Sequence, residues 1–263
     1  MLPIFFITLK GLFRERVFRG ILISAVLFLG IPFISTLSMR QVAELSITLS
    51  LSLISFILLL LSVFLGGSSF WKDVERRYVF SVLGLPVSRT DYLLGKLGAV
   101  AGFVLLIAIV LGLIACAVIW LASSAYPPTL RPVVWTNIFF AIFFDALKYV
   151  LLVGIAFLFS TVSTSFFLPI FGTVSIFLVG SATQELYDFI RISEQAFSPL
   201  VKNIITLLYY FIPNFGAFDL KVNAVYGISL SPAGLMMTAG YFILYFALVV
   251  SLSSILFSRR ELR

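Results

Sequence analysis

The sequence predicts an all-α integral membrane protein with six membrane-spanning helices and both termini in the cytoplasm. Its composition is the first reason, because 61% of the 263 residues are hydrophobic and only 11% are charged, unlike a soluble domain. The second reason is that six apolar runs are long enough to cross a bilayer core of roughly 30 Å, which needs ~20 residues per helix. These runs are 20–39, 46–70, 97–122, 135–160, 165–182 and 233–257.

The distribution of Lys and Arg residues predicts the orientation of the six spans. Most of them precede the first run, separate the second from the third, or follow the sixth: Lys10, Arg14, Arg16, Arg19, Lys72, Arg76, Arg77, Arg89, Lys96, Arg259, Arg260 and Arg263. The positive-inside rule places these connections in the cytoplasm. We therefore expect a multi-pass protein of the inner (plasma) membrane that forms a single domain over residues 1–263. This topology explains the net charge of +7 without binding to nucleic acid.

Residues 1–18 precede the first run and are predicted to form an interfacial helix on the cytoplasmic side. Phe5 and Leu9 fall near one helical face, whereas Lys10 and Arg14 fall on the other. An amphipathic helix of this kind lies in the plane of the membrane surface. The alternative is that these residues are a slanted extension of the first span.

Several kinds of chemistry are excluded by composition. The chain has no His, and its single Cys, Cys116, lies inside an apolar run. This excludes His-based zinc sites, Ser-His-Asp triads and a disulfide framework. Gly95 and Lys96 lack the rest of a phosphate-binding loop, so ATP and Mg would have to be bound by a partner. We expect no catalytic residue, metal site or cofactor in this chain.

The segment 71–96 between the second and third runs is charged and longer than a simple turn requires. Pro86 is expected to end one short helix. Ser88 is a suitable N-cap for the next helix, and Asp91 three residues later strengthens that helix start. The result is a helix, a break and a second helix below the membrane. Such a segment is either a docking element for a cytosolic partner or an ordinary solvated loop.

Three stretches of the sequence carry a resemblance to a known family. They are ERRY, LGLPVSR and YLLGK within 75–96, LYYFIPNF and FDL within 208–220, and FSRREL at 257–262. Together they resemble permeases of the ABC-2 transporter family, in particular the branch that serves nitrous oxide reductase maturation. One departure is that the family's E-x-E-R-G-T-x-E pattern reads DVERRYVF at 73–80, without the second acidic cluster at its end.

The resemblance implies a role for the cytosolic segment. In the family a coupling helix between spans two and three sits in a groove of a separate ABC ATPase, which assigns that role to about 81–90. The implied interface residues are Arg76, Arg77, Leu83, Leu85, Pro86, Val87, Ser88 and Arg89. The arginines would face either the ATPase or the anionic headgroups of membrane lipids.

The resemblance also implies a function and partners. It points to the permease subunit of an ABC transporter, an exporter that acts as a homodimer with two copies of the ATPase. The substrate stays open: a lipid, a hydrophobic peptide or drug, or a component needed for periplasmic metalloenzyme assembly. Two alternatives stay open. One is a non-transporting membrane subunit that passes ATPase motion to a periplasmic protein or recruits one. The other is an intramembrane enzyme.

Asp145 and Lys148 are the only charged residues deep inside a predicted span. If Trp135 marks the outer interface, Asp145 lies about 15 Å inward at 1.5 Å per residue. Their i, i+3 spacing permits an ion pair on one helical face. Because charges inside a membrane are costly, the pair is either a mutually neutralised structural contact or a contact for substrate.

Two further patterns concern helix packing and the outer surface. Gly98 with Gly102, and Gly112 with Cys116, are spaced to allow another helix to approach the third span closely. The outer segment 183–232 is long and amphipathic. We expect it to form two half-inserted or interfacial helices that act as an outer lid. The alternative is a loop loosely associated with the membrane.

Overall fold

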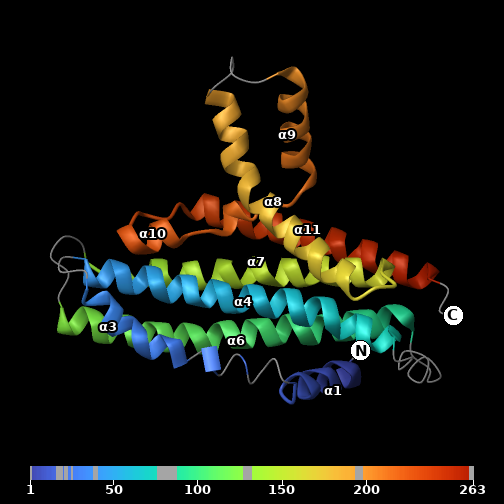
Figure 1. Cartoon of the computed structure of the whole chain (residues 1–263), viewed down its shortest axis with the longest axis horizontal. Coiled ribbons are helices and arrows are strands. Elements are labelled where there is room, and N and C mark those ends of the chain that lie inside the picture. The colour runs from blue at the N-terminus through green and yellow to red at the C-terminus, as the bar shows by residue number, and fades with distance from the viewer. Residues whose placement is uncertain are drawn as a thin grey trace.

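The computed structural model describes residues 2–15, 20, 23–24, 26–37, 41–75, 88–126, 132–192 and 198–260, and within these it contains helices and no strand (Figure 1). The elements are α1 (Leu2–Leu12), η1 (Leu27–Gly30), α3 (Ile31–Ser35), α4 (Val42–Glu75), α6 (Arg89–Ala125), α7 (Trp135–Val162), α8 (Phe167–Ile192), α9 (Pro199–Phe211), η2 (Gly216–Phe218), α10 (Lys221–Tyr226) and α11 (Pro232–Arg259). Five of them, α4, α6, α7, α8 and α11, are long and apolar enough to span a membrane. The prediction of an all-α, multi-pass membrane protein is thereby supported.

The long helices α4, α6 and α7 lie side by side and form the centre of the bundle, with α11 against α7 (Figure 1). Helix α7 is the most enclosed of these helices. In its most apolar stretch 72% is buried by the rest of the protein, compared with 11% in α11. Small residues allow α4 to approach α7 closely. A Cβ atom at Gly66 would lie only 2.8 Å from the Cβ atom of Ala156. This contact holds Ser55 of α4 within reach of the charged residues of α7.

The first apolar run, 20–39, is the one predicted span that the described residues do not show as a long helix. Towards the end of this run, the structure describes a 3-10 turn, η1, which is followed by the five-residue helix α3. Pro32 occupies the first turn of α3, where a missing N–H group is tolerated, and it prevents a regular helix from continuing through this point. Six spans and cytoplasmic termini therefore stay predictions.

Helix α1 packs beside α6 and ends at Leu12, earlier than the predicted boundary at residue 18. The Phe5 ring lies over the two small residues of α6, with Cζ 3.5 Å from a Cβ atom built at Gly102 and Cδ2 3.7 Å from one built at Gly98. On the other side of the bundle, a Cβ atom at Gly112 would lie 3.2 Å from Ile142 of α7. The predicted close packing is confirmed at Gly112, whereas Gly98 and Gly102 would leave room for a Cβ atom in ordinary contact with Phe5.

Helices α8 and α9 form a hairpin that projects from the side of the bundle (Figure 1). The Tyr187 and Tyr209 rings stack between the two helices, with centroids 4.2 Å apart and an interplanar angle of 9°. Two short helices were expected within 183–232; α9 corresponds to the second of them, whereas α10 was not predicted. The expected boundary at residue 182 is wrong, however, because α8 continues unbroken to Ile192. The assignment of this segment to the membrane interface stays a prediction.

Candidate functional site

The predicted coupling segment is only partly described. Arg76, Arg77, Leu83, Leu85, Pro86 and Val87 lie outside the described residues. Ser88 is the N-cap of α6: its Oγ accepts a 3.0 Å hydrogen bond from the Asp91 N–H group and donates a 2.6 Å bond to Asp91 Oδ2. The predicted helix start at this serine is confirmed.

Arg89, the first residue of α6, binds the end of another helix of the same chain. Its Nη1 group donates to the carbonyl oxygens of Ser258 at 3.2 Å and Arg260 at 2.8 Å. Ser258 lies in the last turn of α11 and Arg260 is its C-cap residue; carbonyls at this end of a helix lack intrahelical partners, and the helix dipole favours a cation there. The structure thus places Arg89, expected to face an ATPase or lipid headgroups, against α11.

Arg260 repeats this contact at a third helix. Its Nη1 group donates to the carbonyl oxygens of Ser160 at 3.2 Å and Thr161 at 2.8 Å, and its Nη2 group donates to Ser163 at 2.7 Å. Partial burial lowers the pKa of Arg260, but an arginine remains protonated in proteins. We call this set of contacts, from Arg89 to α11 and from Arg260 to α7, the arginine relay.

A second cluster joins α4 and α6, the two helices on either side of the predicted coupling segment. Lys96 of α6 forms an ion pair with Asp73 of α4, and the Tyr92 hydroxyl donates a hydrogen bond to the same carboxylate oxygen. Lys96 and Tyr92 are almost fully buried. Sequence reasoning did not assign this cluster, although Tyr92 and Lys96 have the i, i+4 spacing that places them on one helical face.

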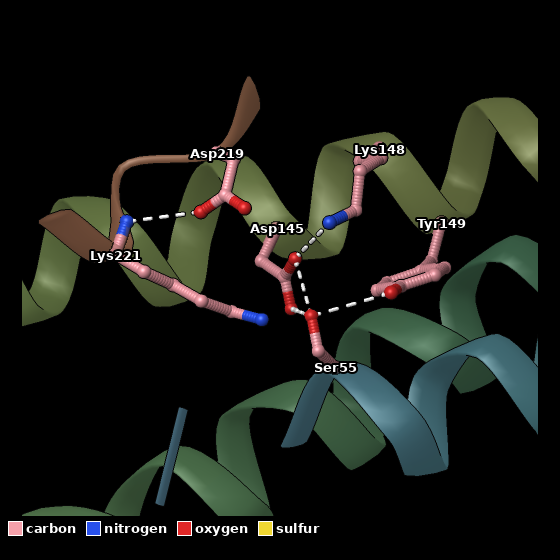
Figure 2. A network of polar contacts seen from close by, with 6 residues as sticks. All are labelled: Ser55, Asp145, Lys148, Tyr149, Asp219 and Lys221. Carbon is pink, nitrogen blue, oxygen red and sulfur yellow. Dashed lines mark hydrogen bonds and ion pairs between the residues drawn. The ribbon is translucent and has the colours of Figure 1, made fainter. Parts of the chain in front are cut away.

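The charged pair inside the membrane is present and buried. Lys148 Nζ lies 2.5 Å from Asp145 Oδ1, and the two residues are 5% and 7% exposed. The Ser55 hydroxyl of α4 lies 2.9 and 2.8 Å from the two Asp145 carboxylate oxygens, and the Tyr149 hydroxyl donates to Ser55 Oγ at 3.2 Å (Figure 2). The predicted ion pair is confirmed, and Ser55 connects it to the neighbouring helix.

Two charged residues from the outer segment lie beside this pair, and sequence reasoning missed them. A narrow crevice between α4, α7 and the chain before α10 is lined by Asp145, Asp219 and Lys221. Figure 2 shows the Lys221 side chain extending toward the Asp145 carboxylate, while Asp219 Oδ1 accepts a 3.0 Å bond from the Lys221 N–H group. The site therefore combines two carboxylates with two lysines.

Close packing around Gly180 positions these two residues. The Phe215 N–H group donates to the Gly180 carbonyl at 3.1 Å, and a Cβ atom at Gly180 would lie 2.4 Å from the Pro213 carbonyl oxygen. Phe215 and Phe218 are fully buried, which draws the following Asp219 toward the bundle. In the sequence, the i, i+3 spacing of these two phenylalanines was the feature that could have indicated packing of this segment against the helix bundle.

The buried network is suited to holding helices together. The Ser55 hydroxyl is directed at the Asp145 carboxylate, and the carboxylate oxygen that contacts Lys148 is one of the two that Ser55 contacts. In the described part of the chain, no group of three acidic or thiol side chains could hold a metal ion. No model of a known protein family matches this sequence, and no curated protein matches it.

Proposed function

We propose that this chain is the membrane permease subunit of an ABC transporter that exports an amphipathic substrate. Two copies of the chain would work with two copies of a cytosolic ATPase, which would bind ATP and Mg. The resemblance of residues 75–96, 208–220 and 257–262 to ABC-2 permeases supports this proposal, and so does the multi-pass helical architecture.

The observation that carries the proposal is the arginine relay. The chain leaving the cytosolic segment 76–87 enters α6 at Arg89, and this residue binds α11 directly. Arg260, at the end of α11, binds the last carbonyls of α7. A displacement of the segment would therefore reach three membrane helices without passing through a flexible connection.

The opposite end of the segment is also fixed. Asp73 near the end of α4 is held by Lys96 and Tyr92 of α6. Deeper in the bundle, Ser55 attaches α4 to Asp145 of α7. Helices α4, α6 and α7 would consequently respond as one body to a push from an ATPase, as a transport cycle driven from the cytosol requires.

The direct test is co-purification with a P-loop ATPase in mild detergent, combined with a change in the coupling segment. Leu83→Asp places a charge where an apolar groove of the ATPase is expected, so it should detach the ATPase or abolish its stimulation. Leu83→Ile is the matched control and should retain both. The absence of any co-purifying ATPase, or normal stimulation in the Leu83→Asp protein, would contradict the proposal.

A second candidate is a non-transporting subunit that passes ATPase motion to a periplasmic partner. The α8–α9 hairpin favours it, because it projects from the bundle and leaves Leu200, Leu207 and Phe211 largely exposed. The two functions differ in a reconstituted system. Substrate movement by the permease and ATPase alone supports transport, whereas ATP hydrolysis without movement supports the second candidate.

A further inference from the structure

A pocket of about 450 Å³ lies between α8, α9 and α11, away from the Asp145 network. Its volume falls within the range typical of small-molecule sites. Its lining includes Gln184 of α8, Tyr209 and Tyr210 of α9, and Met237, Tyr241 and Tyr245 of α11. The contacts described above for transport do not use this pocket.

Aromatic rings form two walls of the pocket. Tyr241 and Tyr245 are one turn apart on α11, with ring centroids separated by 4.5 Å. Tyr209 and Tyr210 of α9 have centroids 5.4 Å apart and are nearly perpendicular, at 76°. The Tyr245 hydroxyl donates to the Tyr210 carbonyl oxygen at 3.3 Å, so the two walls are connected. Tyrosine faces are negative in electrostatic potential and attract cations.

The base of the pocket is a preformed polar network. The Asn214 N–H group donates to the Tyr241 hydroxyl at 2.7 Å, and Asn214 Nδ2 donates to Gln184 Oε1 at 2.6 Å. Gln184 Nε2 in turn donates to the Asp188 carboxylate at 2.8 Å. None of the residues lining the pocket is a lysine or arginine, whereas a carboxylate adjoins it. The electrostatic environment therefore disfavours anions.

We propose that this pocket binds a lipophilic organic cation, such as a quaternary ammonium or phosphonium compound. The charge would lie against the tyrosine faces, and apolar groups would contact Met237 and the exposed faces of α9. Met237 and Tyr245 lie about 8 and 20 Å from the start of α11 at 1.5 Å per residue. In the predicted orientation this depth corresponds to the outer leaflet, from which an amphipathic cation could enter.

This binding site does not depend on the proposed transport function, because cation binding to the isolated chain needs no ATPase. The test uses the purified chain in phosphatidylethanolamine nanodiscs, with empty nanodiscs to subtract partitioning into lipid. Equilibrium binding of tetraphenylphosphonium is compared with binding of tetraphenylborate, an anion of nearly the same size and shape. We expect saturable binding of the cation and at least tenfold weaker binding of the anion.

Variants locate the site. Tyr245→Leu removes one ring and should weaken cation binding about tenfold, whereas Tyr245→Phe keeps the ring and should bind within about twofold of the parent. Tyr126→Leu changes an exposed tyrosine at the end of α6 and should have no effect. Equal binding of cation and anion by the parent chain would overturn the proposal even if a variant failed to fold. So would unchanged cation binding in a folded Tyr245→Leu protein.

A choline lipid headgroup and a free amphiphile offer the same quaternary cation. Repeating the measurement in phosphatidylcholine nanodiscs separates the two sources. Weaker tetraphenylphosphonium binding there would show competition by the headgroup, and equal binding would show a preference for the free cation. Either result supports the site only if Tyr245→Leu also weakens tetraphenylphosphonium binding. Loss of that effect would overturn the proposal.

Discussion

The Nη1 group of Arg89 donates a 2.8 Å hydrogen bond to the carbonyl oxygen of Arg260. The two residues are far apart in the sequence, one at the start of α6 and the other just beyond α11. Because Arg260 itself binds the end of α7, three helix ends are joined by side chain to backbone contacts. Charged donors on exposed helix carbonyls make stronger hydrogen bonds than neutral groups do.

Arg89→Ala should separate the start of α6 from the end of α11. It removes a charge-assisted donor with two carbonyl partners, so the free energy of unfolding should fall by about 1–2 kcal/mol. Arg89→Lys keeps the charge and should recover part of the loss. Thermal unfolding in detergent compares the three proteins, and an unchanged midpoint for Arg89→Ala would show that the contact contributes nothing.

Asp145→Ala should be more harmful than the double change Asp145→Ala with Lys148→Ala. The single change leaves a buried lysine without its nearest carboxylate, a defect that typically costs about 3–5 kcal/mol. The double change removes both charges. Accumulation in the membrane and thermal unfolding report the difference, and equal behaviour of the two variants would refute the ion-pair interpretation.

Gly180→Ala should destabilise the junction between α8 and the Pro213–Phe215 turn. The added methyl group would lie 2.4 Å from the Pro213 carbonyl oxygen, so backbone must move, at a cost of about 1–3 kcal/mol. Gly240→Ala is the matched control, because nothing lies within 4 Å of a Cβ atom at that position of α11. A lower unfolding midpoint is expected for Gly180→Ala alone, and equal midpoints would contradict the packing described here.

Labelling of single cysteines tests the predicted orientation. With Cys116 replaced by Ala, Ser124→Cys at the end of α6 should react with a membrane-impermeant maleimide applied to intact cells. Ser258→Cys at the end of α11 should react only after the membrane is opened. Both serines are exposed, so access to reagent decides the result. The reverse pattern would overturn the assignment of both termini to the cytoplasm.

The sequence was sufficient for the parts of the fold that depend on local patterns. Long apolar runs predicted the five helices of span length, and Ser88 with Asp91 predicted where α6 begins. The i, i+3 spacing of Asp145 and Lys148 predicted their ion pair. Each of these features is determined by residues that lie within a single continuous stretch of the chain.

Contacts between distant segments could not be predicted in this way. Nothing in the local sequence of Arg89 indicates that its partners are carbonyl groups of α11, since every helix end offers such groups. Lys221 belongs to the segment 183–232 that was expected to form an outer lid, yet its side chain extends toward Asp145 (Figure 2). Its position depends on the burial of Phe215 and Phe218, which is a property of the assembled bundle.

The unequal apolar lengths of α6 and α8 have a consequence for the surrounding lipid. At 1.5 Å per residue, the 37 residues Arg89–Ala125 of α6 extend over ~56 Å, whereas the 24 residues Phe167–Ile190 of α8 extend over ~36 Å. A membrane cannot match both lengths at one thickness, and such hydrophobic mismatch is relieved by tilting the longer helix or thinning the bilayer beside the shorter one. A bilayer whose thickness matches α8 therefore requires the longer helix α6 to tilt away from the membrane normal.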